Sequence, residues 1–224
     1  MLWVTAAVPQ ETGYVRRGPQ LQVVHTGVGF TRARAAARDL VSRLAPGDFV
    51  LSTGFCGALD PALAPGQMVL WECAWVEGEP EEVPLETAAP FLHPAGIDLC
   101  RTRGVTVPRI VNAAGEREEL RSRAKAEVVD MESGILARAC RDAGVPCAVA
   151  RVVLDTPADP LRTDYGSIPA PTGDLRGRDV VRWLCLRPWR LGGLLADRRA
   201  AAQVAGRLGE YVNRVAEAHA RRMD

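Results

Sequence analysis

The sequence predicts an α/β fold, a single three-layer α/β/α domain around a central, mostly parallel mixed sheet. Short apolar runs rich in β-branched residues alternate along the chain with stretches of helical periodicity. Most of these runs lack polar alternation, which is typical of strands covered on both faces. The predicted strands span residues 2–8, 21–25, 48–53, 67–76, 105–111, 127–129 and 147–154.

Two helices are predicted between the strands, over residues 30–44 and 131–143. Each repeats aliphatic side chains on one face, such as Leu40 and Leu44 in the first helix. Turn sequences that contain glycine and proline follow both helices and end them. Helices between successive strands provide the crossover connections that a parallel sheet requires.

Two proline-rich segments interrupt this alternation. Residues 77–94 are also acidic, and we expect a surface loop there. Residues 156–175 follow the last predicted strand. A long loop beside the end of a central strand is more often functional than a plain spacer. We therefore expect residues 156–175 to cover a substrate site, with a spacer role as the alternative.

Length and charge restrict the possible classes of protein. A chain of 224 residues suits one domain, expected over residues 1–224 with residues 176–222 as a C-terminal helical extension. The net charge of +1 argues against a generic nucleic-acid-binding protein. Lys125 is the only lysine, so no GxxxxGK[ST] phosphate loop exists. Its polar neighbours also make a Schiff-base amine an unsuitable interpretation.

Cysteine and histidine usage indicates a reducing compartment and no metal site. The six cysteines form no CxxC pair and mostly stand in apolar segments, so we expect buried thiols. The three histidines lack metal-ligand spacing. No apolar run is long enough to span a membrane, and the first residues do not resemble a secretory signal. We expect a cytoplasmic protein without metal or other cofactor, with a peripheral position at the inner face of the membrane as the alternative location.

Three carboxylates follow three predicted strands, and ligands of open α/β sheets bind at the carboxyl ends of strands. For Asp155, after residues 147–154, a general acid or base and a loop cap are equally good interpretations. Glu132 follows residues 127–129 in the segment Asp130-Met131-Glu132-Ser133, where helix capping is by itself the better interpretation. Glu11 alone is an ordinary loop residue. Their recurrence after three strands is the more specific pattern.

Glycine-containing segments follow two other predicted strands. Backbone amides in such segments can approach a ribose or phosphate oxygen, although a tight turn is the usual explanation of so short a motif. The candidate lining of a base or substrate pocket is Gly27, Gly29, Gly54, Phe55, Cys56 and Gly57.

Together these segments resemble the nucleoside phosphorylase/nucleosidase superfamily that includes methylthioadenosine/S-adenosylhomocysteine nucleosidase. The resemblance covers about residues 1–160. The tail over residues 186–212 looks closest to the hopanoid-associated phosphorylase-like branch, which is linked to cleaving adenine from adenosylhopane. The similar segments are HTGVG at 25–29, STGFCGALDPALAPGQMVL at 52–70, VVDMESGILA at 128–137 and RVVLD at 151–155, followed by Ala158-Asp159.

The resemblance implies a nucleoside phosphorylase-like fold and cleavage of an N-glycosidic bond. It implies that Asp155 is the acid at the purine, for which burial must raise its pKa. Glu132 is implied to hold the ribose hydroxyls, with Met131 packed on the sugar. Glu11 matches the residue that activates water in hydrolytic members. Because the family's sites often borrow residues across a dimer interface, a homo-oligomer is expected, with a dimer favoured.

Departures from the family pattern favour water over phosphate as the nucleophile. Phosphate-using relatives carry Arg and Ser where this chain has Ser52 and Phe55, so an anion clamp is lost. Glu11 adds negative charge where a phosphate would sit. Leu154 replaces a Ser beside the acid. Residues 112–120 lack the Phe usually stacked on the base, for which Phe55 is a candidate substitute.

Three functions remain open. The leading one is a purine nucleosidase for an adenosyl compound, including one with a large apolar 5′ substituent. A phosphate-dependent nucleoside phosphorylase or a futalosine-type hydrolase is the second. A non-catalytic nucleoside-binding module is the third, and the joint presence of Glu11, Glu132 and Asp155 argues against it. The expected partners are a small-molecule nucleoside with water or phosphate, and no nucleic acid.

Residues 176–199 combine seven arginines and two aspartates with Trp183 and Trp189. The favoured interpretation is a helix pair that packs its apolar face on the domain and leaves the arginines solvated. The alternative is an amphipathic surface that touches a membrane or an amphiphilic substrate.

Overall fold

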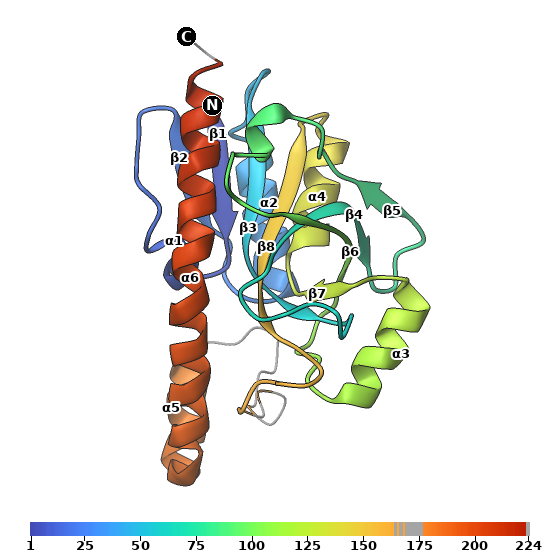
Figure 1. The fold of residues 1–224 in the computed structure, drawn as a ribbon, viewed down its shortest axis with the longest axis vertical. Coiled ribbons are helices and arrows are strands. Elements are labelled where there is room, and N and C mark those ends of the chain that lie inside the picture. The colour runs from blue at the N-terminus through green and yellow to red at the C-terminus, as the bar shows by residue number, and fades with distance from the viewer. Residues whose placement is uncertain (164, 166–167, 169–176, 223–224) are drawn as a thin grey trace.

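The computed structural model describes residues 1–163, 165, 168 and 177–222, and it confirms the predicted α/β fold (Figure 1). Within these residues, eight strands form one mixed sheet. They are β1 (Leu2–Ala6), β2 (Leu21–His25), β3 (Phe49–Ala58), β4 (Met68–Val76), β5 (Glu82–Pro84), β6 (Cys100–Thr106), β7 (Val128–Asp130) and β8 (Cys147–Asp155). The α-helices are α1 (Pro9–Thr12), α2 (Phe30–Val41), α3 (Ala114–Ala124), α4 (Ser133–Asp142), α5 (Gly177–Leu186) and α6 (Leu191–Ala220).

The sheet is mostly parallel and closes on itself. Parallel pairs join β1 to β2 and β3, β3 to β8, and β6 to β4 and β7. The pairs β3–β7, β4–β5 and β4–β8 are antiparallel. Because β8 pairs with both β3 and β4, the strands β3, β8, β4, β6 and β7 form a ring. Its register sets Gly57 of β3 beside both Val129 and Asp155, which brings three strand ends together.

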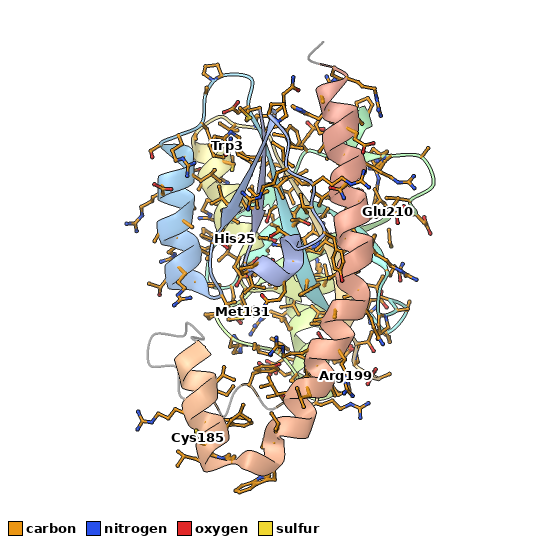
Figure 2. The ribbon with its side chains drawn as sticks, turned by 90° about the vertical axis from the view of Figure 1, so that its left-hand side faces the viewer. Trp3, His25, Met131, Cys185, Arg199 and Glu210 are labelled. Atoms are coloured by element: carbon orange, nitrogen blue, oxygen red, sulfur yellow. The ribbon has the colours of Figure 1, made fainter. Side chains whose placement is uncertain are left out.

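Helices cover both faces of the sheet (Figure 1). On one face α2 and α4 pack together through residues such as Leu40 and Leu136. On the other face the second half of α6 contributes Leu208, Tyr211 and Val215 to the largest hydrophobic cluster. The C-terminal segment predicted as an extension therefore supplies part of the core, while its first part projects past the sheet (Figure 2).

Three strands differ from the sequence prediction because long-range pairing decides their bounds. β3 continues through the second glycine segment to Ala58, since it pairs with β8 over that length. β6 lies at Cys100–Thr106, not at 105–111, in register with β4 and β7. There Gly104 leaves room for the Trp71 ring, whose nearest atom would be 2.0 Å from an added Cβ. The expected acidic surface loop contains the edge strand β5.

The structure confirms only some of the predictions made for the cysteines and for residues 156–175. All six cysteines are free, but only Cys56, Cys140 and Cys147 are buried and Cys185 is exposed. In the described ranges, no helix has the length and apolarity to cross a membrane, and no three His, Cys, Asp or Glu side chains gather as a metal site. The sequence predicts that residues 156–175 cover a substrate site, and most of this loop beyond residue 163 lies outside the described residues.

Candidate active site

A cavity of about 220 Å³ opens where the ends of β1, β7 and β8 meet the end of β3. Apolar side chains from the loop after β6 and from the segment after β8 complete its wall. It brings together seven residues that the sequence predicted for the site: Glu11, Phe55, Cys56, Gly57, Met131, Glu132 and Asp155.

Glu11 is held by backbone amides at one end of the cavity. β1 ends at Ala6, and Pro9 starts the short helix α1, which turns Glu11 back over the strand end. Its Oε2 accepts hydrogen bonds from the N–H groups of Ala7 at 2.7 Å and Val8 at 3.0 Å. Its Oε1 accepts one from Phe55 N–H at 2.9 Å, which leaves that oxygen further acceptor capacity. Burial raises the pKa of Glu11, against the opposing effects of Arg151 and these N–H groups.

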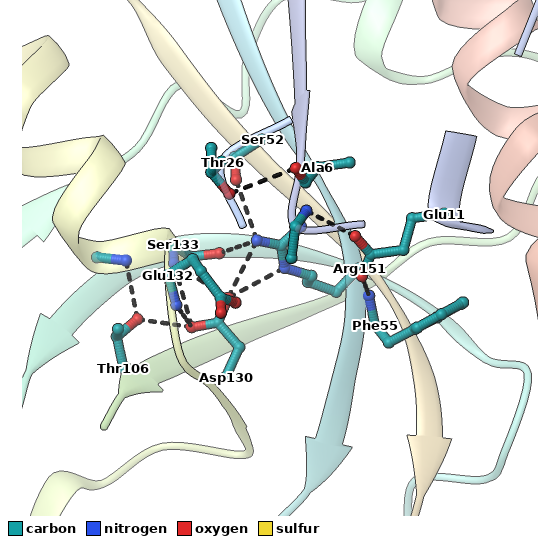
Figure 3. A network of polar contacts seen from close by, with 12 residues as sticks. Ala6, Glu11, Thr26, Ser52, Phe55, Thr106, Asp130, Glu132, Ser133 and Arg151 are labelled. Carbon is teal, nitrogen blue, oxygen red and sulfur yellow. Dashed lines mark hydrogen bonds and ion pairs between the residues drawn. The ribbon is translucent and has the colours of Figure 1, made fainter. Parts of the chain in front are cut away.

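Arg151 is the buried cation beside Glu11, and it stands in the middle of β8 (Figure 3). Its Nε donates to Asp130 Oδ2 at 3.1 Å, and its Nη2 donates to Ser52 Oγ at 3.0 Å and Ser133 Oγ at 2.6 Å. Its Nη1 has no hydrogen-bond partner among the described residues. Arg151 does not line the cavity, so this buried guanidinium acts on the site through its charge next to Glu11.

Gly54 permits the approach of Glu11 and Arg151. A Cβ at this position would lie 2.5 Å from Glu11 Oε1 and 2.9 Å from Arg151 Nη1, and φ is +145°. Gly54 does not line the cavity itself. Its position in β3 keeps a carboxylate and a guanidinium close together at the site.

Asp130 and Glu132, the two acidic residues just before α4, have different roles. Asp130 caps the helix, since its carboxylate accepts hydrogen bonds from Ser133 N–H at 3.1 and 3.2 Å. It also accepts the Thr106 hydroxyl at 2.7 Å. Glu132 makes no capping bond to α4, and its Oε1 instead accepts Gly29 N–H at 2.9 Å. The capping interpretation thus applies to Asp130, while the Glu132 carboxyl faces the cavity.

The environment of Glu132 favours its protonated form. Burial, with the nearby Asp130 carboxylate second, raises the pKa of Glu132 to about 8, although the Gly29 N–H group opposes the rise. Met131 lies beside it on the cavity wall.

Asp155 lies at the other end of the cavity and forms a buried ion pair with Arg117 of α3. Arg117 also donates from Nη1 to the Ala58 carbonyl at 2.8 Å, which ties α3 to the end of β3. Both side chains are almost fully buried. Burial raises the pKa of Asp155, and the Arg117 guanidinium opposes that rise.

Gly27 and Gly29 shape the site without lining the cavity. Gly29 provides the N–H group that binds Glu132, and Gly27 has φ +74° and lies against the Arg32 side chain. Val28 between them does reach the cavity wall.

The sequence reasoning assigned no role to Arg117 or Arg151. An arginine within the apolar run CAVARVVLD is a signal for Arg151, since arginine is rarely buried without a partner. The strong helix formers in EREELRSRA could have indicated α3. Nothing local marks Arg117, whose partner lies 38 residues away.

A family model for the phosphorylase superfamily matches residues 5–167, well over half of the chain. The chain belongs to this superfamily. Members of the superfamily are typically N-glycosidases or phosphorylases that bind nucleosides. No curated protein matches the sequence.

Solved structures similar to this superfamily member agree with the fold. Methylthioadenosine/S-adenosylhomocysteine nucleosidase of Helicobacter pylori has a TM-score of 0.70 at 15% identity, over 96% of this chain and 97% of that one. Futalosine hydrolase of Helicobacter pylori gives the same four values. The corresponding nucleosidase of Campylobacter jejuni has a TM-score of 0.70 at 13% identity, over 96% and 98%.

Proposed function

We propose that the protein is a purine nucleosidase that hydrolyses the N-glycosidic bond of an adenosyl compound. The observation that carries this proposal is the placement of Glu11, Glu132 and Asp155, from three strand ends, around one cavity. Glycosidic cleavage passes through a transition state that resembles an oxocarbenium ion. It is assisted by an acid at the leaving group, a base for the attacking water and groups that hold the sugar.

At the base, Asp155 donates its proton to N7 of the purine as the bond between C1′ and N9 breaks. The purine then leaves as a neutral molecule. Burial supports this role because it raises the pKa of Asp155. Arg117 limits the rise and holds the carboxyl group in place.

At the sugar, Glu132 binds the ribose hydroxyls and Met131 packs on the ring. The oxygen of a water molecule forms the new bond to C1′, and Glu11 accepts the proton that this water loses. The Arg151 guanidinium lies beside Glu11 across Gly54, and its charge favours the ionised form of Glu11 that accepts the proton. The proton gained by Glu11 balances the proton given up by Asp155, so proton exchange with solvent restores both groups.

Water is the nucleophile that this end of the cavity favours. The Phe55 N–H group binds Glu11, and the Ser52 hydroxyl accepts a hydrogen bond from Arg151. A phosphate there would meet the Glu11 carboxylate, and like charges repel at short range. Phosphorolysis is therefore the second candidate, with the positive charge of Arg151 next to Glu11 as the observation in its favour.

For the 5′ substituent we propose a large apolar group, as the resemblance to the hopanoid-associated branch suggests. Apolar side chains on the cavity wall support this choice, and they include Val28, Ile110, Val111, Leu154 and Leu161.

Base release measured by chromatography tests the proposal. The panel contains adenosine, methylthioadenosine, a 5′-alkyl adenosine, inosine and futalosine, each in phosphate-free buffer and with added phosphate. We expect adenine release without phosphate, fastest from the alkyl compound. Release that requires phosphate would show a phosphorylase, and preferential release of hypoxanthine from futalosine would show a futalosine-type hydrolase. Ligand binding without any release from the panel would favour the non-catalytic module.

A further inference from the structure

An exposed cluster of apolar side chains lies where α5 turns into α6. Among the described residues, five large hydrophobic side chains are exposed, and four of them lie here. Single exposed apolar residues are common on soluble proteins, but a contiguous group marks an interaction surface. The group, named the hairpin tip, comprises Leu186 (66% exposed), Trp189 (73%), Leu191 (48%) and Leu195 (43%).

The hairpin tip projects from the body of the domain. In Figure 1, α5 overlaps the first turns of α6, and both lie beyond the end of the sheet. Figure 2 shows the same hairpin, marked by Cys185 and Arg199, below the strands. Leu191 and Leu195 are one turn apart in α6 and therefore share a face of the helix. Trp183 of α5 is buried, whereas Trp189 is exposed.

The charge around the hairpin tip is positive. Within the part of the chain that the structure describes, no contact pairs the surrounding arginines with a carboxylate, whereas some arginines elsewhere on the surface, such as Arg103 and Arg138, pair with glutamates. The acidic residue in this part of α6, Asp197, is buried and accepts hydrogen bonds from Arg162 and Thr163 N–H groups. The arginines around the tip are Arg182, Arg187, Arg190, Arg198 and Arg199.

We propose that the hairpin tip inserts into the surface of an anionic lipid bilayer. Tryptophan and leucine side chains enter the interfacial region of a bilayer, and arginines bind its anionic headgroups. A second copy of the chain is the less favourable occupant. A symmetric contact of this patch with itself would bring the arginines of both copies together.

Docking would bring the bilayer close to the candidate active site. Ala196 and Ala200 of α6, next to the hairpin tip, line a second cavity of about 120 Å³. That cavity shares Leu154, Asp155 and Leu161 with the candidate active site.

Sedimentation of the full chain with vesicles tests the proposal. We expect binding to vesicles of phosphatidylcholine with phosphatidylglycerol at low salt, and little binding to phosphatidylcholine alone. Salt at about 0.5 M should weaken binding severalfold because it screens the arginines. Absence of binding to anionic vesicles at low salt would overturn the proposal.

Variants of the tip make the test specific. The Trp189→Asp change should weaken vesicle binding about tenfold or more, since it places a charge in the interface. Tyr14→Ser, which alters the exposed aromatic ring outside the tip, should leave binding unchanged. Circular dichroism and melting temperature establish that both variants fold. Equal losses in both variants, or no loss with Trp189→Asp, would contradict insertion of the tip.

Fluorescence quenching by brominated lipids reports the position of Trp189. Trp3, Trp71 and Trp183 are buried and Trp75 is half-buried in β4, so quenching of the wild type should come mainly from Trp189. The Trp189→Phe variant should still bind anionic vesicles but lose most of the quenching. Bound protein without quenching would overturn insertion. Self-association that Trp189→Asp abolishes, with no vesicle binding by the wild type, would identify a second copy of the chain as the occupant.

Discussion

A buried arginine lies behind each end of the cavity without lining it, and the two arginines have different partners. At the end that we propose binds the sugar, Arg151 forms hydrogen bonds with Asp130, Ser52 and Ser133. None of these three residues bonds to Glu11. At the end that we propose binds the purine, Arg117 forms an ion pair with Asp155, the residue proposed as the acid.

This difference shows two ways in which a buried arginine affects the pKa of a buried carboxyl group. Glu11 has a neighbouring positive charge but keeps acceptor capacity on Oε1, as a base for water requires. Asp155 forms an ion pair with a guanidinium, which favours the ionised carboxylate over the protonated form that an acid needs. Burial promotes the acid form, and Arg117 sets the pH at which that form is lost.

Removing the acid at the base end should have the largest effect. Asp155→Asn should lower the rate of base release by a factor of about 10²–10⁴, the usual contribution of a general acid. It should also cost up to about 3–5 kcal/mol in the free energy of unfolding, since Arg117 loses its buried partner. Initial rates and denaturant titrations measure the two effects.

A second change separates catalysis from stability at this pair. Adding Arg117→Met to Asp155→Asn removes the unpaired cation, so most of the stability should return while the activity stays low. Activity near the wild-type rate in Asp155→Asn would refute the role of Asp155.

At the sugar end, Gly54→Ala should destabilise the fold by about 2–4 kcal/mol, combining steric overlap and backbone strain. The new Cβ would overlap Glu11 Oε1 and crowd Arg151 Nη1. Gly78→Ala is the matched control, since φ there is +86° but no atom lies within 4 Å of an added Cβ. Denaturant titration should show the larger loss for Gly54→Ala, and equal losses would show that crowding at Glu11 contributes nothing.

The pH dependence of base release tests how Arg117 acts. Arg117→Met removes the charge that favours ionised Asp155, so the pKa of Asp155 should rise further. Since the acid must be protonated, the basic limb of kcat should move to higher pH. Arg117→Lys should restore the wild-type profile if charge is the cause. A shift of the acidic limb instead would show that Asp155 acts in its ionised form.

The last prediction concerns the pH dependence of stability and Glu132. Because its pKa is raised from 4.5 to about 8 on folding, the native state keeps a proton that the unfolded state loses between these pH values. This group's stabilising contribution is complete below pH 4.5 and is lost as the pH rises through about 8. Glu132→Gln should therefore flatten the fall of melting temperature over this window. Glu118→Gln on the surface is the control, and an unchanged slope in Glu132→Gln would contradict the raised pKa.

Local sequence patterns predicted much of the fold and the position of the carboxylates. Apolar runs located β8 closely, because burial on both faces selects such runs wherever they occur in the chain. The run at β2 also has the observed bounds, although this edge strand is only partly buried. Glu11 and Asp155 follow β1 and β8, which are both parallel to β3, so their carboxyl ends meet at one edge. Glu132 follows β7, which is antiparallel to β3 and reaches the same edge because Val129 pairs with Gly57. β6 was displaced, since pairing with β4 and β7 sets its register.

The sequence by itself determined the α/β class and a group of acidic residues at the strand ends. Only the tertiary structure decided which cation serves which carboxylate, and that Asp130 caps α4 while Glu132 faces the cavity. Local patterns indicate burial and periodicity, because these depend on residues that are close together in the sequence. The pairing of Arg117 with Asp155 depends on α3 packing against the end of β3, and only the folded arrangement of distant segments specifies that contact.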